Sequence, residues 1–469
     1  MDKSALLGSL PPEWPEDLLP AIQRQVKAQG RKVIVLDDDP TGTQTVHGVP
    51  VLTEWPVDAL RAELENDLPA VYLLTNSRSL PLPEAQALNR EIGRNLSEAA
   101  RSAGRGIAVV SRSDSTLRGH FPGEVEALAG ALETAFDAWL IIPFFLEGGR
   151  YTIGDVHYVA EGDALVPASE TPFARDAVFG YRASDLRAWV EEKTAGRVRA
   201  DDVASVTIDD LRGGGPAHVT RRLLDLRRGS VCVVNAASYA DLDVFALGLL
   251  DAEARGRRFL YRTAASFVRV RAGITPRPLL TRDDLNLPEA GGALLLIGSY
   301  VPKTTDQVNA LLAQPGLCSV EIDVARLLDD GCRAREIARA AEAINGALGN
   351  GHDIVAYTSR RLVTGSDAQG NLAIGRRVSE GLIALARAVE TRPRYLVAKG
   401  GITSSDVATQ ALGVRRALVM GQILPGVPVW RLGAESRYPG LPYVVFPGNV
   451  GGPDALVALV RALQPGANG

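Results

Sequence analysis

The stretch RKVIVLDDDPTGTQT, residues 31–45, decides the fold. Residues 32–36 are mostly aliphatic or β-branched, which is typical of a buried strand, and they run directly into Asp37, Asp38 and Asp39. Carboxylates therefore follow the carboxyl end of a strand, the edge at which open α/β sheets bind ligands. Adjacent acids repel one another, so this turn needs a cation, a shared proton or backbone donors. A solvated acidic turn is the alternative, because Asp and Pro both favour turns.

Three later segments repeat this pattern of an apolar strand followed by polar residues. They are AVYLLTNSRSL (70–80), the strand 106–110 with its loop SRSDSTLRG, and AWLIIPFFLEGGRYTIGDVHYV (138–159). Helical segments separate the strands, which predicts βαβ units and a largely parallel sheet with helices on both faces. The polar loops of such a sheet share one edge. We therefore expect residues 37–41, 76–78 and 114–118 and Arg150 to line one pocket.

The second half of the chain contains two glycine-rich loops. YLVAKGGITSSDVATQAL (395–412) joins a strand to Gly400 and Gly401, and residues 403–406 then offer side chains for helix N-cap chemistry. VVFPGNVGGPDALVALV repeats the strand-to-helix design. Glycines let a backbone approach a ligand closely, and a helix N-terminus favours an anion such as phosphate. Each loop alone is equally compatible with an ordinary turn, but two in one domain favour a nucleotide.

The length of 469 residues exceeds one ordinary hydrophobic core and favours two domains. Residues 262–292 are rich in Pro, Gly and charge without clear periodicity, which places the domain junction there. We predict an α/β protein of two three-layer α/β/α domains with largely parallel sheets, residues 1–270 and 285–469. The active site is expected in the cleft between them.

Composition excludes several classes of function. A formal charge of −4 gives no general attraction to nucleic acid or to an anionic membrane, and no apolar window approaches the roughly 20 residues of a membrane helix. The N-terminus has too short an apolar run and too many prolines for a signal peptide. Three scattered cysteines indicate a reducing compartment, and neither cysteines nor histidines have metal-site spacing. We expect a cytoplasmic protein without a protein-built metal site.

One alternative enzyme class has support in the acidic turn. Asp37, Asp39 and Thr41 form DxDxT after an apolar strand, the nucleophile motif of haloacid-dehalogenase-type phosphatases, in which Asp37 would be the nucleophile. That mechanism also needs a lysine and a late acidic motif for magnesium, and the first domain shows neither convincingly. The large second domain would be unexplained.

Read together, LDDDPTGTQT, TNSRSL, SRSDSTLRG, PFFLEGGRYTIGDVHYV, AKGGITSSDVA and VFPGNVGG resemble the four-carbon acid sugar kinase family, in order, over roughly residues 31 to 460. The resemblance implies an acid-sugar-binding N-terminal domain and a nucleotide-binding C-terminal domain. It implies ATP-dependent phosphorylation of the terminal hydroxyl of threonate, erythronate or 3-oxo-tetronate. The nucleotide contacts that it implies are Ser299, Gly400, Gly401, Ile402, Thr403 and Gly448. Many members read GGETS here, so Ile402 replaces an acidic residue near the proposed phosphates.

The residues and the resemblance together give an expected acceptor site. Guanidinium groups bind carboxylates well, so Arg78, Arg118 and Arg150 are candidates for the carboxylate of the substrate. Asp37 or Asp114 would accept the hydroxyl proton, and Asp38, Thr41 and Ser115 complete the substrate site. Mg²⁺ should bridge the phosphates of ATP. The expected partners are a small sugar acid and ATP, with no nucleic acid and no membrane, and a homodimer is left open. A non-catalytic sugar-acid or nucleotide sensor is the third alternative, beside the kinase and the phosphatase.

Overall fold

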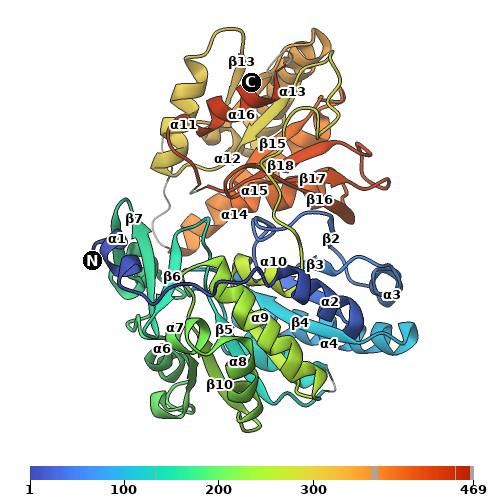
Figure 1. Cartoon of the computed structure of the whole chain (residues 1–469). Helices are drawn as coiled ribbons and strands as arrows, with labels where there is room; N and C mark the ends of the chain where they lie inside the picture. Colours follow the sequence, from blue (N-terminus) through green and yellow to red (C-terminus); the bar gives the residue numbers. More distant parts are fainter. Residues whose placement is uncertain (133, 361–362, 364–367, 449, 465–469) are drawn as a thin grey trace. The chain divides into compact units, whose positions relative to one another are not determined.

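The computed structural model describes residues 1–132, 134–360, 363, 368–448 and 450–464. The chain divides into two compact units, Met1–Pro276 and Arg277–Gly469. Each is built on a mainly parallel sheet with helices packed on its faces (Figure 1). The predicted α/β class with largely parallel sheets is thus confirmed. The predicted position of the active site between the domains stays a prediction.

The sheet of the N-terminal unit is entirely parallel. Its strands follow the order β2-β3-β1-β4-β11-β5-β10-β9, which places β1 near its centre. The strands are β1 Lys32–Asp37, β2 Val49–Leu52, β3 Ala70–Leu74, β4 Ile107–Arg112, β5 Ala138–Ile142, β9 Ala204–Val206, β10 Ser230–Val234 and β11 Phe259–Thr263. Because β1 pairs with β3 on one side and β4 on the other, the residues after these three strands lie side by side.

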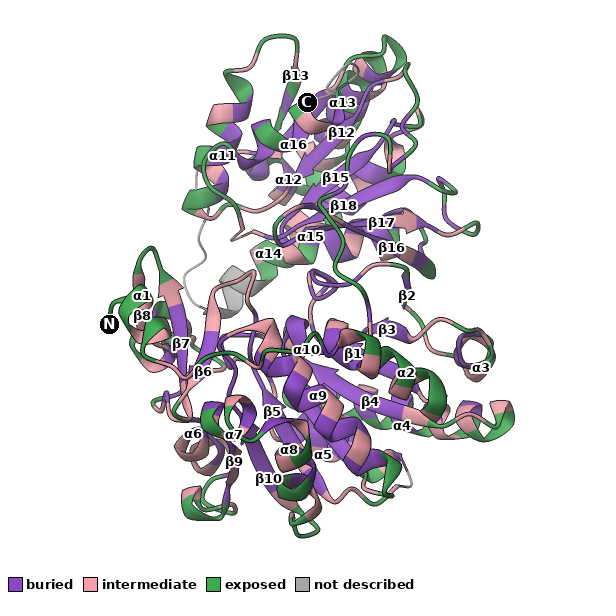
Figure 2. Ribbon diagram, viewed as in Figure 1, coloured by how far each residue is buried: buried purple, intermediate pink, exposed green. Residues whose placement is uncertain are grey.

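Helices bury both faces of this sheet. The helices of this unit are α1 Lys3–Gly8, α2 Leu19–Gln29, α3 Val57–Glu65, α4 Leu82–Ala103, α5 Gly123–Ala131, α6 Leu186–Lys193, α7 Ile208–Arg212, α8 Gly215–Leu224, α9 Tyr239–Ala254 and α10 Ala265–Arg271. Every residue of β1 is buried (Figure 2), as a parallel strand covered on both sides requires. Ile34 and Leu36 belong to one core with Ile92 of α4 and Val125 of α5. This packing fixes the strand that carries the acidic turn.

The polar segment predicted after the strand, up to residue 159, contains strands of its own. β6 Arg150–Ile153, β7 Val156–Glu161 and β8 Ala164–Pro167 form a separate antiparallel sheet. The tight turns at Gly154–Asp155 and Gly162 have positive φ, which glycine adopts without steric cost. These strands carry many polar residues because the sheet is only partly buried, so they lack the apolar pattern by which a strand is predicted.

The start of the predicted junction, residues 262–292, overlaps two regular elements that were not predicted, the end of β11 and all of α10. β11 lies between β4 and β5 in the sheet, and α10 follows it directly. Charged residues make both elements look like surface loop in the sequence, although these residues find partners inside the protein. Arg271 of α10 donates to Glu253 of α9 over 2.6 Å, and Tyr261 of β11 donates to the same carboxylate. The chain divides after Pro276, which lies inside the stretch 262–292.

The C-terminal unit carries a mixed sheet in the order β13-β14-β12-β15-β18-β17-β16. The first five strands are parallel, and β16 and β17 form an unpredicted antiparallel hairpin at one end. The strands are β12 Leu294–Ile297, β13 Cys318–Ile322, β14 Ile354–Thr358, β15 Leu396–Lys399, β16 Arg416–Leu424, β17 Val427–Leu432 and β18 Pro442–Phe446. The helices are α11 Pro302–Leu312, α12 Val324–Leu328, α13 Asp330–Gly349, α14 Ala368–Ala388, α15 Gly401–Asp406 and α16 Ala455–Leu463. Among the described helices, none has the length and apolar character needed to span a bilayer.

The ion pair between Arg271 and Glu253 gives a test of this packing. Both side chains are at most 2% exposed, so Arg271→Met leaves a buried carboxylate without its cation. We expect the free energy of unfolding to fall by about 3 to 5 kcal/mol, measured by denaturant titration of the full chain. Arg255→Met is the matched control, because its pair with Asp251 is exposed and should contribute at most about 1 kcal/mol. Equal losses for the two variants would contradict the assigned role of the buried pair.

Candidate active site

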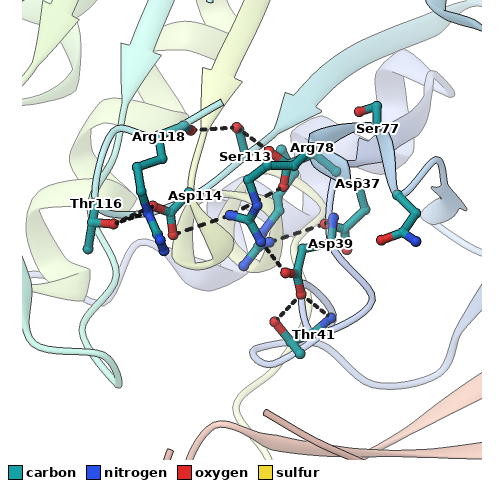
Figure 3. A network of polar contacts seen from close by, with 12 residues as sticks. Asp37, Asp39, Thr41, Ser77, Arg78, Ser113, Asp114, Thr116 and Arg118 are labelled. Atoms are coloured by element: carbon teal, nitrogen blue, oxygen red, sulfur yellow. Dashed lines mark hydrogen bonds and ion pairs between the residues drawn. The ribbon is translucent and has the colours of Figure 1, made fainter. Parts of the chain in front are cut away.

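The polar loops of the N-terminal unit meet at the carboxyl edge of its sheet. β3, β1, β4 and β11 are consecutive strands, so the residues that follow them are neighbours in space. Asp37 ends β1, Arg78 lies in the 3₁₀ turn Ser77–Ser79 after β3, and Asp114 follows β4. Figure 3 shows these side chains in one network of polar contacts. The structure therefore brings together predicted residues that lie up to 77 positions apart in the sequence.

Arg78 links three carboxylates of this network. Its Nη2 donates to Asp39 Oδ2, and its Nη1 lies 3.9 Å from Asp38 Oδ1 and 3.4 Å from Asp114 Oδ1. The side chain is 19% exposed, so water screens these interactions only in part. An opposite charge at such distances favours the ionised form of a carboxyl group. The cation that the acidic turn requires is thus provided by the neighbouring strand.

Asp37 is the most buried of the four acids in the network, with 1% of its surface exposed. Its Oδ1 accepts from Arg112 over 3.1 Å, whereas its Oδ2 has no hydrogen-bond partner among the described residues. Gly42 covers that oxygen so closely that a Cβ atom there would lie 1.8 Å from it. Burial raises the pKa of Asp37 to about 7, helped by the charges of Asp38 and Asp39 and opposed by Arg112. This carboxyl group can therefore exchange a proton near neutral pH.

Hydroxyl groups hold the other two acids of the turn. Ser113 Oγ donates to Asp38 Oδ2 over 2.5 Å. Thr41 donates to Asp39 Oδ1 twice, through its backbone N–H at 2.8 Å and through its hydroxyl at 2.5 Å. Burial alone would raise the pKa of Asp39, but Arg78 and Thr41 outweigh burial and lower it. Asp39 is therefore an anion at neutral pH, and Thr41 fixes the shape of the turn.

Asp114 and Arg118 form an ion pair on the loop after β4. Arg118 Nε donates to Asp114 Oδ2 over 2.8 Å, and Thr116 Oγ1 donates to the same oxygen. Arg118 Nη1 also lies 3.6 Å from Asp176 Oδ2. Burial would raise the pKa of Asp114, but Arg78 and Arg118 hold it well below its usual range. A carboxylate with so low a pKa is a weak proton acceptor.

Arg150 begins β6 beside this loop. Its guanidinium donates to the carbonyl of Gly148 and lies 5.6 Å from the centre of the Phe173 ring, on which Arg118 packs at 5.1 Å. Within the described residues Arg150 forms no salt bridge, and its buried Nε lacks a hydrogen-bond partner. The guanidinium groups of Arg118 and Arg150 thus both pack on the Phe173 ring. No described carboxylate forms a salt bridge with Arg150.

Ser115 is held through its backbone. The buried His157 places Nε2 2.7 Å from the Ser115 carbonyl oxygen and Nδ1 3.0 Å from Thr152 Oγ1. A carbonyl oxygen can only accept, so Nε2 carries the proton and Nδ1 accepts from the threonine hydroxyl. Burial lowers the pKa of His157 to about 4, which keeps the ring neutral at physiological pH. His157 therefore supports the 113–118 loop as a neutral donor.

The nucleotide contacts predicted in the C-terminal unit lie at the carboxyl ends of three strands. Ser299 follows β12, Gly400 follows β15 and Gly448 follows β18. A Cβ atom at Gly400 would lie 3.3 Å from Ser299 Cβ, and one at Gly448 would lie 3.3 Å from Ser299 Oγ. Gly400 also has a φ of +116°, which side-chain-bearing residues rarely adopt. We call the surroundings of Ser299, Gly400 and Gly448 the glycine cradle.

The helix after the glycine cradle begins earlier than predicted. α15 starts at Gly401 with Gly400 as its N-cap, so the predicted N-cap chemistry of residues 403–406 is wrong. The N-cap residue here has no side chain, and residues 403–406 lie inside the helix. Ser404 Oγ donates to the carbonyls of Ala398 and Gly400, each over 2.7 Å. Ile402 lies in the first turn and is 60% exposed.

Comparison with known proteins assigns both units to described domains. Residues 33–271 match the family model of a sugar-binding N-terminal domain, and residues 294–456 match that of a nucleotide-binding C-terminal domain. A 3-oxo-tetronate kinase from Cupriavidus necator is 31% identical to this chain over 367 residues, 75% of this chain and 77% of the relative. The chain belongs to the four-carbon acid sugar kinase family. It is accordingly an ATP-dependent kinase.

Further relatives of this kinase agree with the assignment. A D-threonate kinase from Cupriavidus necator is 26% identical over 78% of this chain and 80% of the relative. The solved structure of a Salmonella typhimurium LT2 protein covers 92% of this chain and 100% of its own, with a TM-score of 0.67 and 19% identity, and so shares the fold. The aspartyl phosphatase and the non-catalytic sensor receive no support from these matches.

Two arginines of the kinase's polar network fall outside the predicted set. Arg112 ends β4, which extends two residues beyond the predicted strand, and Arg262 lies in the unpredicted β11. Arg262 Nη2 donates to the carbonyl of Arg118 over 3.1 Å. Both are charged residues at the carboxyl end of an apolar strand, the same signal that singled out Asp37. For Arg112 the signal needs only the correct end of β4, whereas for Arg262 it needs β11, which the sequence pattern does not reveal.

The raised pKa of Asp37 predicts a pH-dependent stability. Between the unfolded value near 3.8 and the folded value of about 7, the folded kinase holds a proton that the unfolded chain does not. Stability should therefore fall as pH rises from 5 to 8, by roughly 2 to 3 kcal/mol from this group. Asp37→Asn lacks this dependence. Between pH 5 and pH 8, its free energy of unfolding relative to that of the wild type should therefore rise by the same amount, measured by denaturant titration at both pH values.

Asp114→Asn is the matched control for this measurement. The pKa of Asp114 lies below its usual range, so the group stays ionised in both states between pH 5 and 8. The stability difference between this variant and the wild type should be nearly constant across that interval. A constant difference for Asp37→Asn as well would contradict the raised pKa.

Proposed function

We propose that this kinase transfers the terminal phosphoryl group of ATP to the terminal hydroxyl of a four-carbon sugar acid of the threonate, erythronate or 3-oxo-tetronate type. The observation that carries the proposal is the network of acids and arginines, which lies inside the segment matched by the sugar-binding family model. Relatives named 3-oxo-tetronate kinase and D-threonate kinase support this class of acceptor. A hydroxy acid needs cations for its carboxylate and acceptors for its hydroxyls, and the network offers both.

Arg150 is the proposed ligand of the substrate carboxylate. Arg78 and Arg118 already form ion pairs with carboxylates of the chain, which compensate much of their charge. Arg150 has no such partner among the described residues, and the Phe173 ring holds it beside Arg118. A guanidinium binds a carboxylate through two parallel hydrogen bonds, which also fixes the orientation of the acid. In this proposal Arg78 is a positioning residue that keeps Asp39 and Asp114 in place.

Asp37 is the proposed acceptor of the hydroxyl proton. Phosphoryl transfer depends mainly on positioning and charge stabilisation, with an acidic residue taking the proton of the attacking hydroxyl. A pKa of about 7 suits this task at neutral pH, whereas the low pKa of Asp114 suits binding. Because Gly42 covers Asp37 Oδ2, the proposal requires the turn 40–44 to open when the acceptor binds.

The glycine cradle is the proposed site of ATP. Ser299, Gly400 and Gly448 let the backbone approach a ligand, and residues 401–403 supply backbone N–H groups of the first turn of α15. Magnesium, when bound with ATP, neutralises part of the phosphate charge and is held largely by phosphate oxygens and water. The described residues include no group of three or more His, Cys, Asp or Glu side chains that could hold a metal. The proposal therefore assigns the ion to the nucleotide.

The proposed function predicts ADP release that depends on a sugar acid. In a coupled assay with MgATP, at least one stereoisomer among threonate, erythronate and 3-oxo-tetronate should be phosphorylated. Asp37→Asn should lower kcat by roughly 10²- to 10⁴-fold, the usual contribution of a general base. Phosphate release from sugar phosphates without ATP would indicate a phosphatase, and binding without turnover would indicate a sensor. Either outcome would contradict the proposal.

A second kinetic experiment tests the role of Arg150. Arg150→Ala should raise the KM for the sugar acid by roughly ten- to hundredfold, because a hydrogen bond to a charged group contributes about 1.5 to 3 kcal/mol. The KM for ATP should not change. Arg182→Ala is the control, since its side chain is 91% exposed and should leave both constants unaltered. An Arg150→Ala enzyme with normal KM for the acid would exclude this arginine as its ligand.

A further inference from the structure

Lys399 is a buried cation beside the glycine cradle. It ends β15, directly before Gly400, and none of its surface is exposed. Its Nζ donates to the carbonyl of Pro447 over 3.0 Å and lies 4.0 Å from the centre of the Phe446 ring. No salt bridge to Lys399 occurs within the described residues. A carbonyl and an aromatic face stabilise an ammonium group, but neither supplies the negative charge that a buried cation needs.

Arg360 is a second cation beside Ser299. Its Nη1 donates to the Ser299 carbonyl over 2.9 Å, and its Nε and Nη2 donate to the carbonyl and hydroxyl of Thr358 over 3.0 and 2.8 Å. The side chain is half-buried and likewise lacks a salt bridge in the described part of the chain. Three hydrogen bonds to neutral oxygens thus hold the guanidinium at the ends of β12 and β14.

The charge of these two groups is disfavoured in the structure as it stands. Burial, together with the charge of the nearby Lys303 at the start of α11, lowers the pKa of Lys399 to about 7. Burial also lowers the pKa of Arg360, against the opposing effect of Glu321 and Tyr357. A buried charge without an ionic partner is costly, so such groups are normally paired. Their presence at the glycine cradle indicates that a ligand supplies the missing negative charge.

We propose that Lys399 and Arg360, at the ends of the strands on either side of β12, bind the phosphate groups of the nucleotide. Because Lys399 is fully buried, the proposal requires the Pro447 carbonyl to move away from its Nζ when the phosphate binds. This inference rests on the proposed function, because it takes the glycine cradle as the site of ATP. The glycines at 400 and 448 allow the backbone to come close to Ser299, and Thr304 Oγ1 holds the arrangement through Ser299 Oγ at 3.1 Å and the Gly448 carbonyl at 3.3 Å. The two cations then provide the charge stabilisation that phosphoryl transfer requires.

Binding of adenosine, AMP and MgADP to the full chain tests this inference by calorimetry. Lys399→Met and Arg360→Met should each weaken MgADP binding by roughly ten- to hundredfold, the effect of losing a hydrogen bond to a charged group. Adenosine binding should stay within twofold of the wild type, because the nucleoside has no phosphate. Arg392→Met is the control: its guanidinium also donates to a backbone carbonyl in the same unit, that of Pro439, and MgADP binding should not change.

The outcomes separate this inference from the proposed function. A wild type that binds none of the three ligands would overturn both. Normal MgADP binding by both Lys399→Met and Arg360→Met would overturn the inference alone. An equal loss of adenosine and MgADP binding would also overturn it, because it would show a structural role in the loop of Pro447 or at Thr358. If one variant fails to fold, the other still decides between these results.

Discussion

The ionic contacts of Arg78 with Asp38, Asp39 and Asp114 are the constraint on which the acceptor site depends. Without a cation from the adjacent strand, carboxylates on two neighbouring turns would repel one another in a largely buried place. The parallel strand order β3-β1-β4 provides that cation, because it puts the residue after β3 beside the turns after β1 and β4. The apolar core that buries β1 on both faces thus also fixes the charges at its end.

The same arrangement gives two carboxyl groups opposite properties. Asp114 receives Arg78, Arg118 and Thr116 and stays ionised, whereas Asp37 is buried with one oxygen unpartnered and titrates near neutral pH. Environments that separate the pKa values of neighbouring acids commonly separate their roles in catalysis. In the proposed function, Asp114 accordingly binds the substrate and Asp37 takes the proton. In the C-terminal unit, Lys399 and Arg360 form no salt bridge with any described residue at the place where a polyanionic nucleotide is proposed to bind.

Much of the fold could be predicted because strong local patterns agree with the tertiary structure. The apolar run before Asp37 is β1, and the apolar run that opens AVYLLTNSRSL is β3. β11 could not be found in the same way, because Arg262 interrupts its apolar pattern and its charge is accommodated only by distant contacts. The antiparallel strands β6 to β8 are short and partly exposed, so their composition resembles a loop. In the site, the acids and Arg78 could be chosen from position alone, but the unpaired charge of Arg150 and the support from His157 depend on contacts across the fold.

The central claim is that the acidic turn after β1 binds the acceptor hydroxyl of a sugar acid whose carboxylate lies on Arg150. A crystal structure of the kinase with a bound four-carbon acid tests this claim most directly. The account predicts the carboxylate within hydrogen-bond distance of Arg150 and the terminal hydroxyl within hydrogen-bond distance of Asp37, with the turn 40–44 displaced from Asp37. An acid bound away from this network, or bound with its carboxylate toward Asp37, would contradict the account.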